Sequence, residues 1–340
     1  SLKEIKGRIN SISSTLAITS AMKMVAAAKL QKAQMAIQNM LPYERRLHSM
    51  LIDLMGAVNM SAPASEEGSA RLVSLSNQPD HTESEGAYSL MAQRQVRKVA
   101  IVAFASNSSL CGAFNSNVIR EATAVINEYR ASGLGDADIT VYSVGRKMAE
   151  AMRKLGFPSP ADFTKMSDSP SYDAASALAQ ELFDGFVSGR FDKVELVYNH
   201  YKSTSSQPTT RQTYLPLSLA DATADIQVGK ITDSASEPYA DKVAEPVVRQ
   251  NSPTTETPDL IVEPSKEELI ATLLPKVVRL RVFTTLLDST AAEHAARTVA
   301  MQLATDNGND LLQELTLEYN KGRQQKITSE ILDLVGGSMQ

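Results

Sequence analysis

The stretch ITSAMKMVAAAKL, residues 18–30, lies at the centre of a long heptad pattern near the N-terminus. Residues 8–41 contain neither Gly nor Pro, and as a helix they would span roughly 50 Å. Positions alternately four and three residues apart form one face of that helix, which we call the seam. The seam consists of Ile5, Ile9, Ile12, Leu16, Thr19, Lys23, Ala26, Leu30, Ala33, Ile37 and Met40, and only the polar Thr19 and Lys23 interrupt it. A period near 3.5 residues predicts a left-handed coiled coil with another long helix.

A second long helix is predicted at the other end of the chain. From residue 276 to residue 335 there is no Pro, and Gly occurs only at positions 308 and 322. We expect Pro275 to start or kink this helix, and Gly336 and Gly337 to end it. Its recurring apolar residues are Leu311, Leu315, Tyr319, Ile327, Ile331 and Leu334. Two long terminal helices predict an antiparallel hairpin that carries a globular domain.

The middle of the chain has the pattern of an α/β domain. Apolar runs predict strands at 98–104, 139–145, 193–201 and 213–219. Helices are predicted at 115–131, with Asn115 as a possible N-cap, and at 146–156 and 171–189. Alternation of strands and helices indicates a layered, mainly parallel, Rossmann-like sheet.

These patterns divide the chain into five parts. An N-terminal coiled-coil helix covers 1–60, the α/β domain 98–220 and a C-terminal coiled-coil helix 269–340. Between them, 61–97 is an acidic linker or insertion and 221–268 a polar one, both poor in core residues.

Charge is unevenly distributed along the chain, whose net charge is −5. Residues 1–46 hold eight basic and two acidic residues, a balance of +6, so the remaining chain carries −11. This asymmetry indicates either acidic partners for the N-terminal helix or a solvated charged face.

The single Cys111 excludes an internal disulfide and suits a reducing compartment. No apolar run approaches the roughly 18 residues of a membrane span, so we expect contact with a membrane only through partners.

No motif for catalysis or for a cofactor stands out. The phosphate-binding patterns GxxxxGK[ST] and GxGxxG are absent, as is the nucleophile motif GxSxG. The four His are scattered, without metal-ligand spacing. We therefore predict no catalytic, cofactor-binding or metal-binding residue. Two alternatives stay open: a nucleotide-binding enzyme with a coiled-coil arm and a phosphate cradle near Gly112, and a coiled-coil scaffold or nucleic-acid binder.

Both ends of the chain closely resemble the gamma subunit of F-type ATP synthases. The N-terminal match comprises SLKEIKGRINSI and ITSAMKMVAAAKLQKAQ, and the C-terminal match comprises EHAARTVAMQLATDNGNDL and LTLEYN. The middle matches more weakly, through SLCGAFN, DKVELVYN and YLPL. Coiled coils share a period, whereas these matches share residues in the family's order.

The resemblance implies a rotor shaft, present in one copy per complex, that transmits torque between a membrane c-ring and the catalytic alpha/beta ring. It implies alpha, beta and epsilon subunits and the c-ring as partners, no nucleic acid and no cofactor. The shaft itself would not be catalytic, and coupled ATP synthesis and proton transport would belong to the complex. The expected location is the cytoplasmic face of a bacterial plasma membrane, as a peripheral subunit, or alternatively an organellar inner membrane.

The resemblance also assigns partner-contact residues, position by position. Met22 and Lys23 match a segment near the lever region of the beta subunit. Arg323, Gln324 and Thr328 match positions that contact the catalytic head. Residues 331–339, with Ile331 and Leu334, match the end of the helix that turns in an apolar sleeve.

Several residues depart from the family pattern. Ala17 replaces a usual Lys, and Asn107, Ser108 and Ser109 replace Asp, Arg and Gly, which removes charges that this loop would use for contacts. Gly322 replaces a usual Ala and should loosen the helix by about 1 kcal/mol. Segment 61–93 and the region around 232–258 are longer than in typical bacterial members. One Cys excludes the thiol regulation of photosynthetic relatives.

Overall fold

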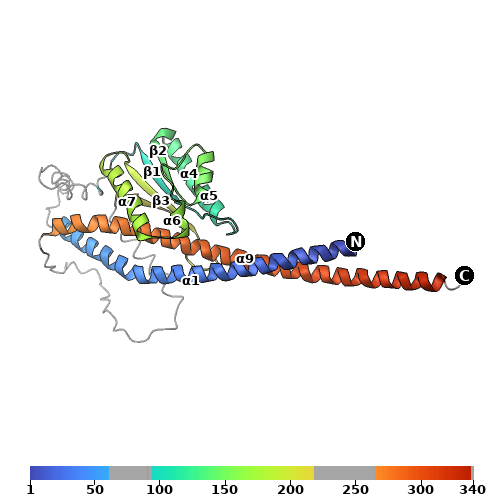
Figure 1. The fold of residues 1–340 in the computed structure, drawn as a ribbon. Helices are drawn as coiled ribbons and strands as arrows, with labels where there is room; N and C mark the ends of the chain where they lie inside the picture. The colour runs from blue at the N-terminus through green and yellow to red at the C-terminus, as the bar shows by residue number, and fades with distance from the viewer. Residues whose placement is uncertain (61–89, 91–93, 218–262, 264, 338–340) are drawn as a thin grey trace, which may run out of the picture.

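The computed structural model describes residues 1–60, 90, 94–217, 263 and 265–337. Two long helices lie side by side, α1 (Leu2–Met60) and α9 (Lys266–Gly337), and an α/β domain sits against one end of the pair (Figure 1). The helices are antiparallel, and α9 extends beyond the N-terminus of α1. Most of the two predicted insertions, 61–97 and 221–268, lies outside the described residues.

The predicted seam of α1 faces α9. Every seam position is buried or half-buried, and Ala26, Leu30 and Ala33 are fully covered. The Thr305 hydroxyl donates a 3.1 Å hydrogen bond to Thr19 Oγ1, so this polar interruption is paired across the two helices. We call the coiled coil of α1 and α9 the shaft.

Two glycines of α9 fix the register of the shaft. A Cβ atom at Gly308 would lie 2.6 Å from Leu16 Cδ2, and one at Gly322 would lie 3.0 Å from Leu2 Cδ2. A side chain at Gly308 would therefore require Leu16 to move, so glycine allows the two helices to approach closely there. Gly322, predicted only to loosen the helix, lies opposite the first turn of α1.

Both long helices continue through a proline, Pro42 in α1 and Pro275 in α9. The prediction that Pro275 could start α9 is wrong, because the helix begins at Lys266. An interior proline costs about 3 kcal/mol. Around it, Ile270, Leu274 and Val278 are at most 2% exposed, and burial of such side chains stabilises by about 1.5–3 kcal/mol each. Packing of this segment outweighs the helix-breaking tendency of its proline.

The domain contains a four-stranded sheet in the order β2-β1-β3-β4. The strands are β1 (Val99–Phe104), β2 (Ile139–Val144), β3 (Lys193–Asn199) and β4 (Thr209–Leu215). β1 pairs in parallel with β2 and β3, whereas β4 is an antiparallel edge strand. The last strand was predicted four residues too late, at 213–219. Its polar first half gives no apolar signal, and Pro216 has no N–H for the ladder.

Helices cover both faces of the sheet. Alternate residues of β1, Val99, Ile101 and Ala103, pack against α4 (Phe114–Ala131) and α5 (Arg146–Lys154). The other face packs against α7 (Tyr172–Val187) and against α1 and α9. The short helices η2 (Asp136–Asp138) and α6 (Thr164–Asp168) lie in the connections. The predicted fold class, a terminal coiled coil with a layered α/β domain, is confirmed.

Asn115 is not the N-cap that the sequence indicated. The α4 helix begins one residue earlier, at Phe114, and the Asn115 carboxamide oxygen accepts a 3.0 Å hydrogen bond from the Ser106 N–H. The loop between β1 and α4 competes successfully for this side chain, because its backbone N–H groups also need partners. Asn115 therefore fixes the loop rather than the helix end.

Candidate functional site

The residues predicted to contact partners lie at two levels of the shaft. Met22 and Lys23 are half-buried and lie within one turn of Thr19, which bonds to Thr305. Arg323 follows Thr305 by 18 residues, or roughly 27 Å along α9. The structure therefore divides the predicted contact residues into two groups. The upper-shaft group is Met22 and Lys23, and the end group is Arg323, Gln324, Thr328, Ile331 and Leu334.

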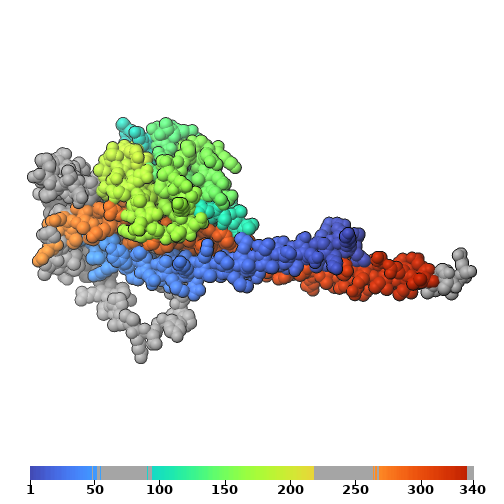
Figure 2. Space-filling model, in the orientation of Figure 1, coloured from blue at the N-terminus to red at the C-terminus, as the bar shows by residue number. Residues whose placement is uncertain are grey.

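The end group lies on a part of α9 that α1 does not cover. Leu2, at the start of α1, faces Gly322, so the α9 residues from 323 to 337 extend past the coiled coil, and we call them the tip (Figure 2). Arg323, Gln324 and Thr328 are exposed there. The Thr328 hydroxyl donates to the Gln324 carbonyl oxygen, so this hydroxyl has its hydrogen-bond acceptor within the same helix.

The tip carries uncovered apolar side chains. Ile331 is 55% exposed and Leu334 is 74% exposed. Contiguous apolar surface of this kind marks interaction sites in soluble proteins. The exposed large apolar residues of the tip are Ile327, Ile331, Leu332 and Leu334. The geometry fits a helix end that inserts into an apolar partner.

Sequence reasoning missed a second set of exposed apolar residues, on the outer faces of the shaft. They are Ile18, Met24, Val25, Leu303 and Leu317, which lie off the seam and are each more than half exposed. Their signal was present in the sequence, because Ile18 and Val25 are seven residues apart and repeat on one face of the helix. The shaft therefore offers apolar surface to partners along its sides as well as at its tip.

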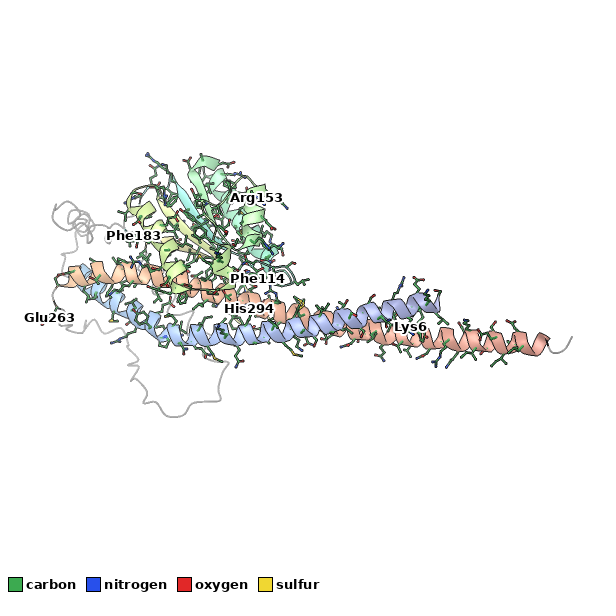
Figure 3. The ribbon with its side chains drawn as sticks, viewed as in Figure 1. Lys6, Phe114, Arg153, Phe183, Glu263 and His294 are labelled. Atoms are coloured by element: carbon green, nitrogen blue, oxygen red, sulfur yellow. The ribbon has the colours of Figure 1, made fainter. Side chains whose placement is uncertain are left out.

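The loop at residues 106–112 docks the domain onto α9. Cys111 and Phe114 pack against Ala292, and Figure 3 labels Phe114 on the domain and His294 on α9. Arg297 Nη2 donates a 2.7 Å hydrogen bond to Ser108 Oγ. Ser108, one of the residues that departs from the family pattern, thus binds a charged side chain of its own chain.

A buried ion pair lies under this loop. Arg297 Nη1 is 2.6 Å from Glu293 Oε1, one turn away on α9, and both residues are less than 10% exposed. Burial raises the pKa of Glu293, while Arg297 and Lys29 act in the opposite direction. The neighbouring His294 is also buried, and burial together with Arg297 and Lys29 lowers its pKa to about 4. His294 is therefore neutral near pH 7.

The loop does not form the phosphate cradle that was considered near Gly112. A Cβ atom on Gly112 would lie 3.9 Å from the Ala300 Cβ, so α9 covers this side of the loop. The Ser106 hydroxyl donates to the Ser108 carbonyl oxygen, and Asn115 Nδ2 donates to Ser106 Oγ. The Ser106 and Asn115 side chains are thus committed to hydrogen bonds within the loop, and the Ser108 hydroxyl to Arg297 of the shaft.

Within ranges 1–60, 94–217 and 265–337, no three His, Cys, Asp or Glu side chains come together as a metal site. None of the helices described there is long and apolar enough to cross a membrane.

Comparison with known proteins gives matches over the whole chain. The sequence profile of the ATP synthase family described as "ATP synthase" matches residues 1–339. The chain is 48% identical over 339 residues to the ATP synthase gamma chain of Phocaeicola vulgatus, covering 100% of this chain and 99% of that one. It is 37% identical over 337 residues to the ATP synthase gamma chain of Flavobacterium johnsoniae, covering 99% and 97%.

Solved structures show the same fold at lower identity. A chain of the Euglena gracilis mitochondrial ATP synthase, from the OSCP/F1/c-ring assembly in rotational state 3, matches with a TM-score of 0.55 and 18% identity, covering 99% of this chain and 93% of that one. A chain from the rotor of the same enzyme, in rotational state 1, matches with a TM-score of 0.52 and 19% identity, covering 96% and 98%.

Proposed function

Since this chain belongs to the family of ATP synthase gamma chains, we propose that its shaft turns inside a ring of alpha and beta subunits and transmits torque to them. The observation that carries the proposal is the α9 tip, which extends beyond α1 with its apolar side chains uncovered. A helix end of this kind needs an apolar socket, and an asymmetric two-helix shaft presents a different face to each subunit around it.

In this proposal the two parts of the molecule have different partners. The helices α1 and α9 form the shaft, whose upper part and tip meet the catalytic ring. The α/β domain, described over residues 98–217, forms the foot, which meets the epsilon subunit and the c-ring of a proton-translocating membrane sector. One copy serves each complex, peripheral to the cytoplasmic face of a bacterial plasma membrane.

The mechanism that the geometry supports is mechanical. Rotation of the shaft changes which face each beta subunit contacts, and only contacts that differ between two states can shift the affinity of a catalytic site. The exposed apolar residues Ile18, Val25 and Leu303 lie on the sides of the shaft, where such state-dependent contacts would form. No step of ATP chemistry is assigned to this chain.

We expect the chain to co-purify with alpha and beta subunits, and the assembly to hydrolyse ATP while the isolated chain does not. The measurement is steady-state ATP hydrolysis by both preparations at equal concentration of this chain. Turnover by the isolated chain, at a rate proportional to its concentration, would favour the alternative of a nucleotide-binding enzyme with a coiled-coil arm.

Photo-crosslinking tests the proposed contact residues. A photoreactive side chain at Met22 or Leu334 is expected to crosslink this chain to alpha or beta subunits in the assembled complex, because Met22 lies on the shaft and Leu334 on the tip. The same group at Leu155, which is 45% exposed on the domain, serves as the control and should give no such product. Equal crosslinking of ring subunits from all three positions would contradict the assignment.

A further inference from the structure

A chain of hydrogen bonds joins the domain to both helices of the shaft. His200 Nδ1 lies 2.6 Å from Asp288 Oδ2 on α9, and the Tyr201 N–H donates to Asp288 Oδ1 at 2.9 Å. Gln34 Nε2 on α1 donates a 2.7 Å hydrogen bond to the Tyr201 hydroxyl. We call these four residues, Gln34, His200, Tyr201 and Asp288, the junction clamp.

The junction clamp lies where the domain meets both helices of the shaft, α1 and α9. His200 and Tyr201 follow directly after β3, a strand inside the sheet, so the clamp connects to the domain core. Tyr201 packs against the shaft cluster of Leu30, Ala33, Ala291 and Ala295, and also against the junction cluster of Cys111, Phe114 and Ala292. Asp288 and His200 are 19% and 26% exposed, so water only partly screens their interaction.

Directionality distinguishes the clamp from the apolar contacts around it. Burial of apolar surface holds the domain against the shaft but is non-directional, so it resists twisting weakly. Hydrogen bonds lose strength steeply as their angle departs from linear. Both oxygens of one carboxylate bind consecutive residues of the domain, which fixes the domain in distance and in rotation about α9.

We propose that the junction clamp is the torsional coupling between the α/β domain and the shaft, and that its strength depends on the protonation of His200. The inference rests on the proposed rotor function, since a torsional coupling matters only if torque passes from the domain to the shaft. His200, Tyr201 and Asp288 are positioning residues, because none of them touches a reacting group.

The charges around His200 set the direction of the pH effect. The hydrogen bond to Asp288 raises the pKa of His200 above its ordinary value, against smaller opposing effects of burial and of Lys202 in the following turn. Toward the clamp, α1 contributes the neutral Gln34. The stabilisation is therefore fully present below the ordinary histidine pKa of about 6.5, and is lost as pH rises through the raised value. His294, on the same helix, has a pKa of about 4 and stays neutral throughout this range.

Hydrogen exchange in the assembled complex tests the clamp directly, through the Tyr201 amide that donates to Asp288. The protection factor of this amide is expected to fall about tenfold, or about 1.4 kcal/mol, between about pH 6 and about pH 9, because deprotonation of His200 loosens the Asp288 carboxylate that accepts from the amide. In Asp288→Asn and His200→Gln complexes, protection should be low at both pH values. Asp173→Asn, the same change at an exposed position of the domain, is the matched control and should behave as the unmodified chain.

Tyr201→Phe provides a milder variant, which removes the bond to Gln34 and retains the packing of the ring. It should keep the pH dependence of the amide and lower its protection at every pH. The number of protons pumped per ATP hydrolysed is measured in the same complexes. His200→Gln should lower this ratio, and the ratio of this variant should lack the pH dependence that the control complex shows.

The outcomes separate this inference from the proposed function. If Tyr201 protection and the pumping ratio are independent of the His200 and Asp288 variants, the clamp is wrong and the rotor function stands. If the unmodified chain assembles with no ring subunits, or its complex pumps no protons, the proposed function fails whatever the exchange data show. A pH-dependent loss of protection that Asp288→Asn removes supports the clamp.

Discussion

Replacing Glu293 by Ala is expected to lower the free energy of unfolding of the full chain by about 3–5 kcal/mol. The substitution leaves the Arg297 guanidinium buried between α9 and the loop at residues 106–112, with its hydrogen bond to Ser108 Oγ but without the carboxylate. An uncompensated buried charge costs more than the ion pair contributes, because neither water nor a counter-ion replaces the lost carboxylate.

The double variant Glu293→Met, Arg297→Met is expected to recover most of the loss. Replacing both charges with apolar side chains of similar length removes the desolvation penalty together with the attraction. Urea unfolding of the three proteins at neutral pH gives the comparison. Glu314→Ala, at an exposed position of the same helix, is the control and should change stability by less than about 0.5 kcal/mol. A double variant as unstable as Glu293→Ala would mean that packing, not charge, holds the junction.

Placing charges on the tip is expected to weaken assembly about 100-fold. In the chain carrying Ile331→Asp and Leu334→Asp, both carboxylates would enter the apolar socket proposed for the tip, and desolvation of unpaired polar groups costs several kcal/mol. The stability of the isolated chain should change by less than about 0.5 kcal/mol, because both side chains are exposed there. The measurement is the concentration of this chain that half-saturates the ATP hydrolysis of reconstituted alpha and beta subunits.

The matched control for the tip is Ile331→Met with Leu334→Met, which keeps both side chains apolar and should assemble as the unmodified chain does. If the aspartate variant also assembles normally, and the complex hydrolyses and pumps at the unmodified rates, then the tip does not lie in an apolar socket. Loss of stability in the isolated aspartate variant would instead indicate that the tip packs within its own chain.

Periodic and apolar patterns in the sequence predicted the seam of α1 and the buried strands β1 and β2. The seam from Ile5 to Met40 is buried or half-buried at every position, because a heptad repeat determines which face of a helix is buried. The buried strands β1 and β2 were located to within one residue by continuous apolar runs. Pro275 was wrong as a possible start of α9, because the packing of Ile270 and Leu274 overrides the strong local signal of a proline.

The functional surfaces were only partly visible in the sequence. The apolar pattern of Ile327, Ile331 and Leu334 was seen in the sequence. Whether α1 covers these residues depends on where the N-terminus of α1 lies along α9, and only the register of the two helices shows this. The junction was not visible, since Ser108 and Arg297 are 189 residues apart and His200 and Asp288 are 88 apart. No local pattern specifies contacts at such separations; they follow from the way the domain docks on the shaft.

Rotation of the domain against an immobilised ring tests the central claim most directly. The complex is attached to a surface through its ring subunits, and a visible probe is attached to this chain at Arg153→Cys, an exposed position on the outer side of the domain (Figure 3). The native Cys111 is only 1% exposed, so the probe should react with the engineered cysteine. A rotating shaft predicts that ATP turns the probe continuously in one direction. A probe that stays still while the complex hydrolyses ATP would contradict it.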